Sequence, residues 1–358
     1  MHAFQPRFAL NQPALHVAFG AGARHDLPAH LDRIGAQRAV VIATPGQDKA
    51  ARALAAALGD HAAGCLPRAR MHTPVDTTEA ALAELAPLRA DALVAIGGGS
   101  AIGLSKALAL RTGLPQIALP TTHAGSEATA VLGETQAGRK TTRTDPRVQP
   151  GTILYDPELT LNLPLSVTIP SALNAIAHAA EGLYARDRTP LATLMATEGL
   201  RAFAAALPRL RTAPDDLDAR AEALYGGWLC GMVLGQVGMA LHHKLCHALG
   251  GSFGLPHAET HAILLPHTIG YTAQAVPQLL APIPEIFGPE DTPGRALHSF
   301  ARSLDAPTAL RDIGLQRADL ARAVEVALDA PYWTPRPPDR AGLTTLLHAA
   351  WEGAPPQA

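Results

Sequence analysis

The stretch ALVAIGGGSAIGLSKAL, residues 92–108, passes from small and branched apolar residues through three glycines into a segment with helical spacing. An apolar run that ends at glycine is typical of a buried strand. Consecutive glycines let the backbone approach a diphosphate closely, Ser100 can cap the helix, and a helix N-terminus offers free N–H groups to an anion. The stretch therefore predicts a strand, a phosphate loop formed by Gly97, Gly98, Gly99 and Ser100, and a helix. A tight turn without a ligand is the alternative.

Similar apolar runs recur in the first 160 residues, at 39–43, 116–119 and 152–155. Ala- and Leu-rich segments of helical spacing, such as 49–58 and 78–88, lie between them. Strands that alternate with helices indicate a largely parallel sheet. The glycine loop is not the GxGxxG pattern, so we expect a Rossmann-like α/β fold that differs from the standard one in detail.

The character of the chain changes after residue 162, where long Ala-, Leu- and His-rich segments of helical spacing begin. Because 358 residues exceed the usual size of one core, we expect two domains: an α/β dinucleotide-binding domain over 1–162 and an all-helical catalytic domain over 163–358. Small ligands often bind in the cleft between two domains. The apolar stretch 226–241 is too short for a membrane span and predicts a buried helix. A last helix is predicted over 340–351.

Composition excludes several classes of partner. The formal net charge is −2, only 17% of residues are charged, and no basic block is present, so we expect neither nucleic acid nor a membrane as a partner. The three cysteines form no CxxC pair and predict neither a disulfide framework nor a zinc site. No secretory signal is visible, so a reducing, cytoplasmic location is expected.

A second loop, PTTHAGSEAT at 120–129, follows the strand 116–119. Hydroxyl groups at the carboxyl end of a strand are placed to contact a ligand that lies across the sheet. Further candidates for cofactor binding follow the strand 39–43 and occupy the segment GRKTT at 138–142. Beside the glycine loop, the predicted cofactor-binding residues are therefore Thr44, Thr121, Thr122, Ser126 and Lys140.

Histidines gather in the second half of the chain. Six of the 16 fall within 26 residues: His242, His243, His247, His257, His261 and His267. His243 and His247 are four residues apart on a predicted helix and share one face. Upstream, Asn174, His178 and Glu181 stand at i, i+4 and i+7 of another predicted helix. Clustered histidines of this kind indicate an active site.

Taken together, the glycine loop, the segment 120–129, the segment DPELT at 156–160 and the histidine block resemble the iron-containing alcohol dehydrogenase superfamily over nearly the whole chain. Two details resemble its maleylacetate reductase branch: the PTTHAGSE loop, and Gly103 where metal-dependent members usually have Asp. The resemblance implies a dehydroquinate synthase-like fold with catalysis between the two domains. It also implies an oxidoreductase that reduces maleylacetate to 3-oxoadipate with NADH or NADPH in the catabolism of aromatic compounds.

The resemblance also implies site residues. The metal ligands of metal-dependent relatives, one Asp and three His, match Asn174, His178, His243 and His257. An amide here replaces the only anionic ligand, so we expect that no metal is required, with His178, His243 and His257 as ligands if one binds.

Roles in catalysis follow from the chemistry of the implied reaction, in which the ketone oxygen becomes an enolate and a neighbouring carbon needs a proton. We expect His243 and His257 to polarise the substrate oxygen, His178 and Asn174 to position them, and His247 to donate a proton. His242, His261 and His267 are expected to be hydrogen-bonded core or surface residues, and Cys246 a small buried residue. The contacts to the substrate carboxylates stay open among His123, Lys140, Arg143 and Lys244.

Three alternatives are a metal-dependent alcohol or aldehyde dehydrogenase of the same superfamily, a cyclase like dehydroquinate synthase that conserves NAD over a turnover, and a non-catalytic nucleotide-binding protein. The choice between NADH and NADPH is open, because no acidic residue follows the strand 39–43 to repel a 2′-phosphate. The expected partners are a small dicarboxylate, maleylacetate or a chloro-derivative, and a second copy of the chain in a homodimer.

Overall fold

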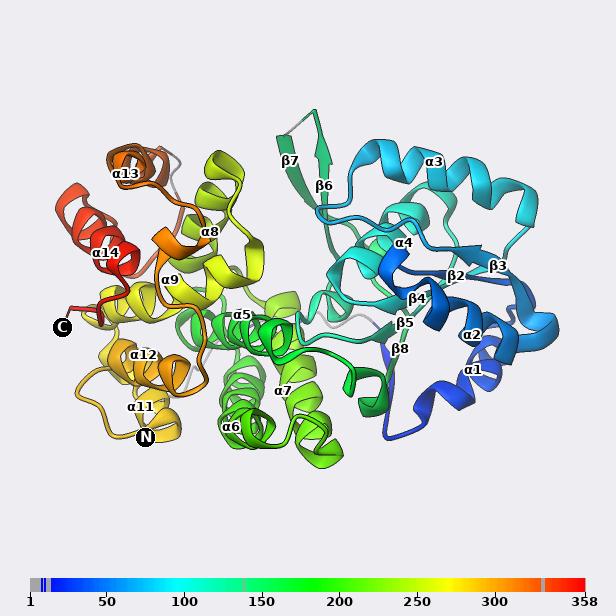
Figure 1. Cartoon of the computed structure of the whole chain (residues 1–358), viewed down its shortest axis with the longest axis horizontal. Helices are drawn as coiled ribbons and strands as arrows, with labels where there is room; N and C mark the ends of the chain where they lie inside the picture. Colours follow the sequence, from blue (N-terminus) through cyan, green and yellow to red (C-terminus); the bar gives the residue numbers. More distant parts are fainter. Residues whose placement is uncertain (1–7, 9, 11–13, 138, 330–331, 358) are drawn as a thin grey trace. The chain divides into compact units, whose positions relative to one another are not determined.

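A computed structural model describes residues 8, 10, 14–137, 139–329 and 332–357, with the side chains of 139 and 140 left out (Figure 1). The chain divides into two compact units: one is Gln12–Leu163, and the other combines Met1–Asn11 with Pro164–Ala358. The assignment of one to cofactor binding and the other to catalysis stays a prediction.

A six-stranded parallel sheet forms the centre of the first unit. Its strands, in spatial order, are β1 (His16–Phe19), β8 (Thr152–Tyr155), β5 (Gln116–Pro120), β4 (Ala92–Gly97), β2 (Ala39–Ile42) and β3 (Ala62–Leu66). The four apolar runs identified in the sequence are β2, β4, β5 and β8, which confirms the predicted parallel α/β fold. A separate antiparallel hairpin consists of β6 (Val131–Gln136) and β7 (Arg139–Thr144).

Helices cover both faces of this sheet (Figure 1). On one face, α1 (Leu27–Arg33) and α2 (Asp48–Leu58) pack against side chains such as Val41. On the other face, α3 (Val75–Leu85) and α4 (Gly99–Thr112) pack against alternate side chains such as Val40. Because the strands are buried on both sides, their sequences are continuously apolar instead of alternating.

The strand order reverses between β2 and β4, which lie side by side. The chain runs outward from β2 to β3, and it runs in the opposite direction from β4 through β5 to β8. Ligands of open α/β sheets bind outside the carboxyl ends of the strands at such a switch point. The residues that follow β2, β4 and β5 therefore form the place where a cofactor is expected.

The second unit is helical, as predicted: its described residues, from 164 to 357 without 330 and 331, contain no strand. The helices are α5 (Leu165–Tyr184), α6 (Pro190–Thr212), α7 (Leu217–Gln236), α8 (Leu241–Phe253), α9 (His257–Ala273), α10 (Pro277–Leu280), α11 (Pro282–Phe287), α12 (Pro293–Ser303), α13 (Leu320–Leu328) and α14 (Arg340–Glu352). The predicted last helix corresponds to α14.

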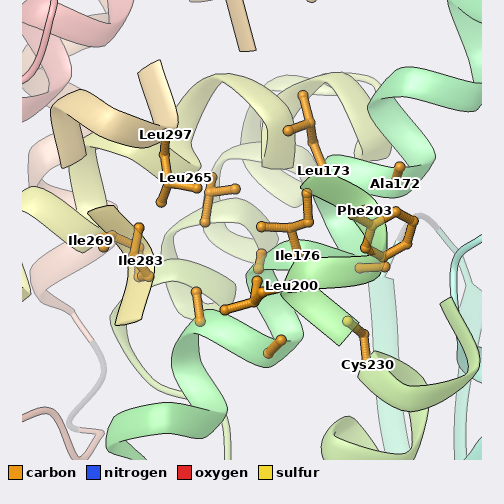
Figure 2. Packing of buried hydrophobic residues seen from close by; sticks show 14 of the residues in the cluster. Ala172, Leu173, Ile176, Leu200, Phe203, Cys230, Leu265, Ile269, Ile283 and Leu297 are labelled. Atoms are coloured by element: carbon orange, nitrogen blue, oxygen red, sulfur yellow. The ribbon is translucent and has the colours of Figure 1, made fainter. Parts of the chain in front are cut away.

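The main core of this unit surrounds α5, which is buried from Thr168 to Tyr184. Figure 2 shows Leu173 and Ile176 of α5 among Leu200 of α6 and Leu265 of α9. A second cluster joins α8 and α9 to α13 and α14. Since α9 contributes to both clusters, polar side chains such as those of His178, His242 and His261 lie deep inside the unit and are held by well-packed helices.

The prediction of one helix over 226–241 is wrong. Helix α7 ends at Gln236 and α8 begins at Leu241, and the two helices meet at an angle of 94°. The backbone N–H of Gly238 donates to Asp187 and that of Ala240 donates to Glu181, so these groups leave the helical pattern. Among the described residues no single helix is long and apolar enough to cross a membrane, although this bent pair passes by length and composition.

Candidate active site

The predicted phosphate loop lies at the carboxyl end of β4. Gly97 has φ +145°, and a Cβ atom there would lie 2.6 Å from Oε1 of Gln47. A Cβ atom on Gly98 would lie 2.7 Å from Cγ2 of Thr122. The glycines therefore let the ends of three strands pack tightly, which leaves backbone N–H groups of α4 near the surface of the loop.

Ser100 does not cap α4, contrary to the prediction. The helix begins at Gly99 with Gly98 as its N-cap residue, and no side chain caps it. Ser100 instead lies in the first turn, because Gly98 takes the extended backbone conformation that an N-cap residue needs. The first N–H groups of α4 are therefore not capped by a side chain, as an anion-binding helix terminus requires.

Gln47 is a candidate cofactor contact that sequence reasoning missed. Its Nε2 donates to Oγ1 of Thr121 at 3.1 Å, and its Oε1 accepts from Oγ1 of Thr44 at 3.3 Å. The side chain thus passes over Gly97 and joins the ends of β2 and β5. Its position three residues beyond Thr44, in the turn after a buried strand, is the only sequence signal that could have indicated it.

Lys106 holds the loop that contains Ser126. Its buried Nζ donates to the carbonyl oxygens of Ser126 at 2.6 Å, Thr129 at 2.7 Å and Val131 at 2.9 Å. Burial lowers the pKa of Lys106 to about 7, and the charge of buried Glu127 opposes this shift. The loop 120–129 is therefore attached to α4, so both predicted cofactor loops belong to one rigid part of the first unit.

The candidate contacts to substrate carboxylates are spread over different elements. Lys140 lies in β7, but its side chain is outside the described part of the structure, and Arg143 of the same strand is exposed. His123 is buried in the loop after β5. Nζ of Lys244 lies 5.8 Å from the centre of the Tyr332 ring. This distribution does not select one of the four.

Five of the six clustered histidines come together in the second unit, with His178 of α5 beside them. Ring centres lie 4.9 Å apart for His178 and His243, 6.2 Å for His243 and His247, and 6.2 Å for His247 and His257. His261 lies 4.4 Å from His257 and 4.9 Å from His243. We call this set the histidine cluster: His178, His242, His243, His247, His257 and His261.

The cluster has a closed side and an open side. His178, His242, His243 and His261 are buried, whereas His257 is half-buried and His247 is exposed. Asn174 is buried one turn before His178 on α5. His267 lies apart, with its ring centre 6.4 Å from that of His298. His242 and His261 are buried and hydrogen-bonded, as expected of core residues, and they also belong to the cluster, whereas His267 is buried outside it.

Glu181 is the buried acid of this region. Its Oε2 accepts a hydrogen bond from Nδ1 of His243 at 2.7 Å and one from the N–H of Ala240 at 3.0 Å, while Oε1 accepts from the N–H of His242 at 2.8 Å. Burial raises the pKa of Glu181, but the hydrogen bond and the charge of His243 outweigh that effect and lower it to about 2. The carboxylate is therefore ionised, orients His243 and stabilises the N-terminus of α8.

Hydrogen bonds fix the tautomer of His242. Oγ1 of Thr268 lies 2.9 Å from the carbonyl oxygen of Leu264, to which it donates, and 2.9 Å from Nδ1 of His242. The hydroxyl therefore accepts from Nδ1–H, and Nε2 of His242 carries the lone pair. That lone pair accepts from Nδ1–H of His261 at 2.9 Å.

Burial keeps the inner rings neutral. It lowers the pKa of His178 and of His261 well below the ordinary value, and neighbouring histidines add to both shifts. Burial and repulsion from His243 lower the pKa of His242 to about 3. Glu181 contacts the His243 ring through the hydrogen bond to Nδ1.

The residues that match family metal ligands fit a divalent cation poorly. Asn174 supplies a neutral amide oxygen where the relatives have a carboxylate. Within the described residues, the ligand atoms of His178, His243 and His257 do not all lie within 4.8 Å of one another, whereas those of His242, Cys246 and His261 do. The family position therefore supplies no anionic ligand and a more widely spaced set of histidine nitrogens.

Comparison with known proteins shows which protein family the chain belongs to. Residues 14–157 match the family model described as iron-containing alcohol dehydrogenase, and residues 168–351 match the one described as Fe-containing alcohol dehydrogenase family, C-terminal. The chain belongs to the iron-containing alcohol dehydrogenase family, whose members are oxidoreductases.

Within this family the chain is similar to maleylacetate reductases. It is 51% identical to the one from Rhizobium sp. (strain MTP-10005) over 99% of this chain and 100% of the relative, and 48% identical to the one from Burkholderia cepacia over 95% and 96%. The crystal structure of maleylacetate reductase from Agrobacterium tumefaciens matches with a TM-score of 0.96 and 50% identity, covering 98% of this chain and 100% of that one. The family resemblance inferred from the sequence is thereby confirmed.

Proposed function

We propose that this chain reduces maleylacetate, or a chloro-derivative of it, to the corresponding 3-oxoadipate with NADH or NADPH in the breakdown of aromatic compounds. The observation that most strongly supports the proposal is the 51% identity with the Rhizobium enzyme over 99% of this chain. The loops at the carboxyl ends of β2, β4 and β5 support dinucleotide binding, because they lie at the switch point of the sheet.

The chemistry requires a hydride at the alkene carbon beta to the ketone and a proton at the neighbouring carbon. As the hydride arrives, the ketone oxygen becomes an enolate, so catalysis needs hydrogen-bond donors aimed at that oxygen and a proton donor near the carbon. Nδ1 of His243 is bonded to Glu181, and Nε2 has no partner in the described part of the chain. When His243 is protonated, Nε2–H is a donor whose charge the carboxylate balances.

The proposed roles follow this arrangement. His243 and His257 stabilise the enolate oxygen, and His178 and Asn174 position these rings. His247, on the open side of the cluster, donates the proton. Glu181 is added to these residues as the group that orients His243 through the hydrogen bond to Nδ1. The cofactor residues proposed are Thr44, Gly97, Gly98, Gly99, Ser100, Thr121, Thr122, Ser126 and Lys140, together with Gln47.

We propose that the chain forms a homodimer in the cytoplasm. Its small-molecule partner is a dicarboxylate substrate. Closed two-fold dimers are the commonest soluble oligomers. Cys65, Cys230 and Cys246 are free thiols, which are typical of a reducing compartment. No metal is proposed as a requirement, because the histidines and Glu181 can stabilise the enolate without one.

The test is oxidation of NADH and of NADPH by the purified chain with maleylacetate, run beside short aldehydes and, in the oxidative direction, short alcohols. Steady consumption of reduced cofactor with maleylacetate is expected, with much slower turnover of the simple substrates. Preferential activity on alcohols or aldehydes would identify a dehydrogenase of the same family instead. Absence of net cofactor consumption during turnover of another substrate would favour the cyclase.

A further inference from the structure

His242 and Cys246 of α8 and His261 of α9 form a compact set of potential ligands inside the second unit. All three are at most 2% exposed, and one ligand atom from each lies within 4.8 Å of the others. None of the three occupies a position that matches the metal ligands of the family. Cys246 also supplies a potential thiolate, the anionic ligand type that the family-matched set lacks.

The separations are close to those around a bound zinc ion. Sγ of Cys246 lies 3.6 Å from Nε2 of His242, and that nitrogen lies 2.9 Å from Nδ1 of His261. Tetrahedral zinc with bonds of about 2.3 Å to sulfur and 2.0–2.1 Å to nitrogen separates such atoms by about 3.6 Å and about 3.3 Å, respectively. The sulfur–nitrogen distance already fits. The two ring nitrogens must move apart by a few tenths of an ångström, and the His261 ring must turn so that Nδ1 points at the cation instead of at Nε2 of His242.

The hydrogen bonding also prepares the set for a cation. The tautomer fixed by Thr268 leaves one lone pair on Nε2 of His242, and both Sγ–H of Cys246 and Nδ1–H of His261 approach it. One lone pair cannot accept two good hydrogen bonds, and Nε2 of His261 has no partner among the described residues. Thr268 meanwhile orients His242 as an outer hydrogen-bond partner orients a metal-bound histidine.

We propose that His242, Cys246 and His261 form a second metal site, which takes a soft or borderline cation such as Zn²⁺. Binding forms one bond from the cation to sulfur and two to nitrogen. The thiol of Cys246 loses its proton to solvent, and the proton of His261 moves from Nδ1 to Nε2, so that Nδ1 becomes a ligand. A cation that enters the histidine cluster therefore stays at the cysteine, away from Asn174.

The test is X-ray absorption spectroscopy on the full-length, chelator-treated protein after it has taken up one equivalent of zinc. We expect one sulfur neighbour at about 2.3 Å together with nitrogen neighbours at about 2.0 Å. A spectrum with only nitrogen and oxygen neighbours, or no stable uptake of zinc, overturns the proposal. This measurement uses the unaltered chain, so it does not depend on whether a variant folds.

Variants locate the site. Cys246→Ser should weaken zinc binding roughly 100-fold or more, because it removes the anionic ligand, while Cys230→Ser should leave it unchanged. Cys230 is a matched control because it too is fully buried and free. His178→Gln should also leave the sulfur neighbour in place. If His178→Gln abolishes zinc binding and Cys246→Ser does not, the cation occupies the family position and the proposal is wrong.

Discussion

The Glu181 carboxylate and the His243 imidazole form a buried pair, with Oε2 2.7 Å from Nδ1. Glu181 is fully buried, and the exposed fraction of the His243 side chain is only 8%. A buried carboxylate without a partner is costly, so the ring and the N-terminus of α8 stabilise the acid as much as the acid orients the ring. The pair gives His243 a fixed orientation and a local counter-charge.

The first prediction concerns this pair. Glu181→Gln keeps the shape of the side chain but removes the negative charge of the carboxylate that accepts the hydrogen bond from Nδ1 of His243. We expect kcat for maleylacetate to fall roughly 100-fold, with a much smaller change in KM. Glu352→Gln, at an exposed position of α14, serves as the control. An unchanged kcat in a folded Glu181→Gln variant would show that His243 does not act through this carboxylate.

Metal removal is the second prediction. Because an amide stands at position 174, exhaustive chelation should leave maleylacetate reduction within about twofold of its starting rate, whatever metal is found by elemental analysis. The rate and the metal content are measured on the same sample. If chelation abolishes activity and one equivalent of iron or zinc restores it, the metal-free stabilisation of the enolate must be abandoned.

The third prediction tests the glycine loop. In Gly98→Ala the added Cβ would lie 2.7 Å from Thr122, so the loop must shift and dinucleotide affinity should fall about tenfold or more. Gly151→Ala is the control, since a Cβ atom there would meet nothing within 4 Å and Gly151 lies outside the proposed cofactor site. Titration of NADH against each folded variant gives the two dissociation constants. Equal affinities would remove the loop from the cofactor site.

Cofactor preference provides a fourth prediction. Thr44 follows β2, where dinucleotide-binding sheets contact the adenosine ribose. Thr44→Asp should disfavour NADPH relative to NADH by about tenfold through repulsion of the 2′-phosphate, whereas the uncharged Thr44→Asn should not. The measurement is the ratio of kcat/KM for the two cofactors. No difference between Asp and Asn at this position would mean that Thr44 lies away from the ribose.

The fifth prediction is that acid destabilises the fold through its buried histidines. Burial, with repulsion from His298, lowers the pKa of His267 to about 3, from an ordinary value of 6.5. The unfolded chain therefore binds a proton below about pH 6.5 that the folded chain does not bind until about pH 3. Stability from this group is complete above pH 6.5 and is lost as the pH falls, by at most about 1.4 kcal/mol per pH unit.

His267→Gln should accordingly reduce the slope of unfolding free energy against pH between about pH 6 and pH 4.5. His25→Gln, at an exposed position, is the control and should leave the slope unchanged. Urea unfolding at several pH values measures both. A His267→Gln variant with the slope of the unaltered chain would show that His267 is protonated in the folded state.

The elements of the fold and the family resemblance could be inferred from local sequence patterns. Runs such as 39–43 and 92–96 are apolar at every position because both faces of β2 and β4 are covered, and that pattern is local. The glycine loop and the histidine spacing are also local, so the strand ends and helix faces that carry Gly98, His178 and His243 could be predicted without coordinates.

Which of these groups touch one another depends on the packing of elements that are distant in the chain. Glu181 meets His243 across 62 positions, and Gln47 meets Thr121 across 74, and no periodicity in the sequence marks such pairs. The same contacts corrected the sequence analysis, because the N–H groups of Ala240 and His242 that bond to Glu181 end the helix predicted over 226–241 and start α8. The packing of α5 against α8 and α9 determines which distant residues form hydrogen bonds. Composition and residue spacing carry no information about this packing.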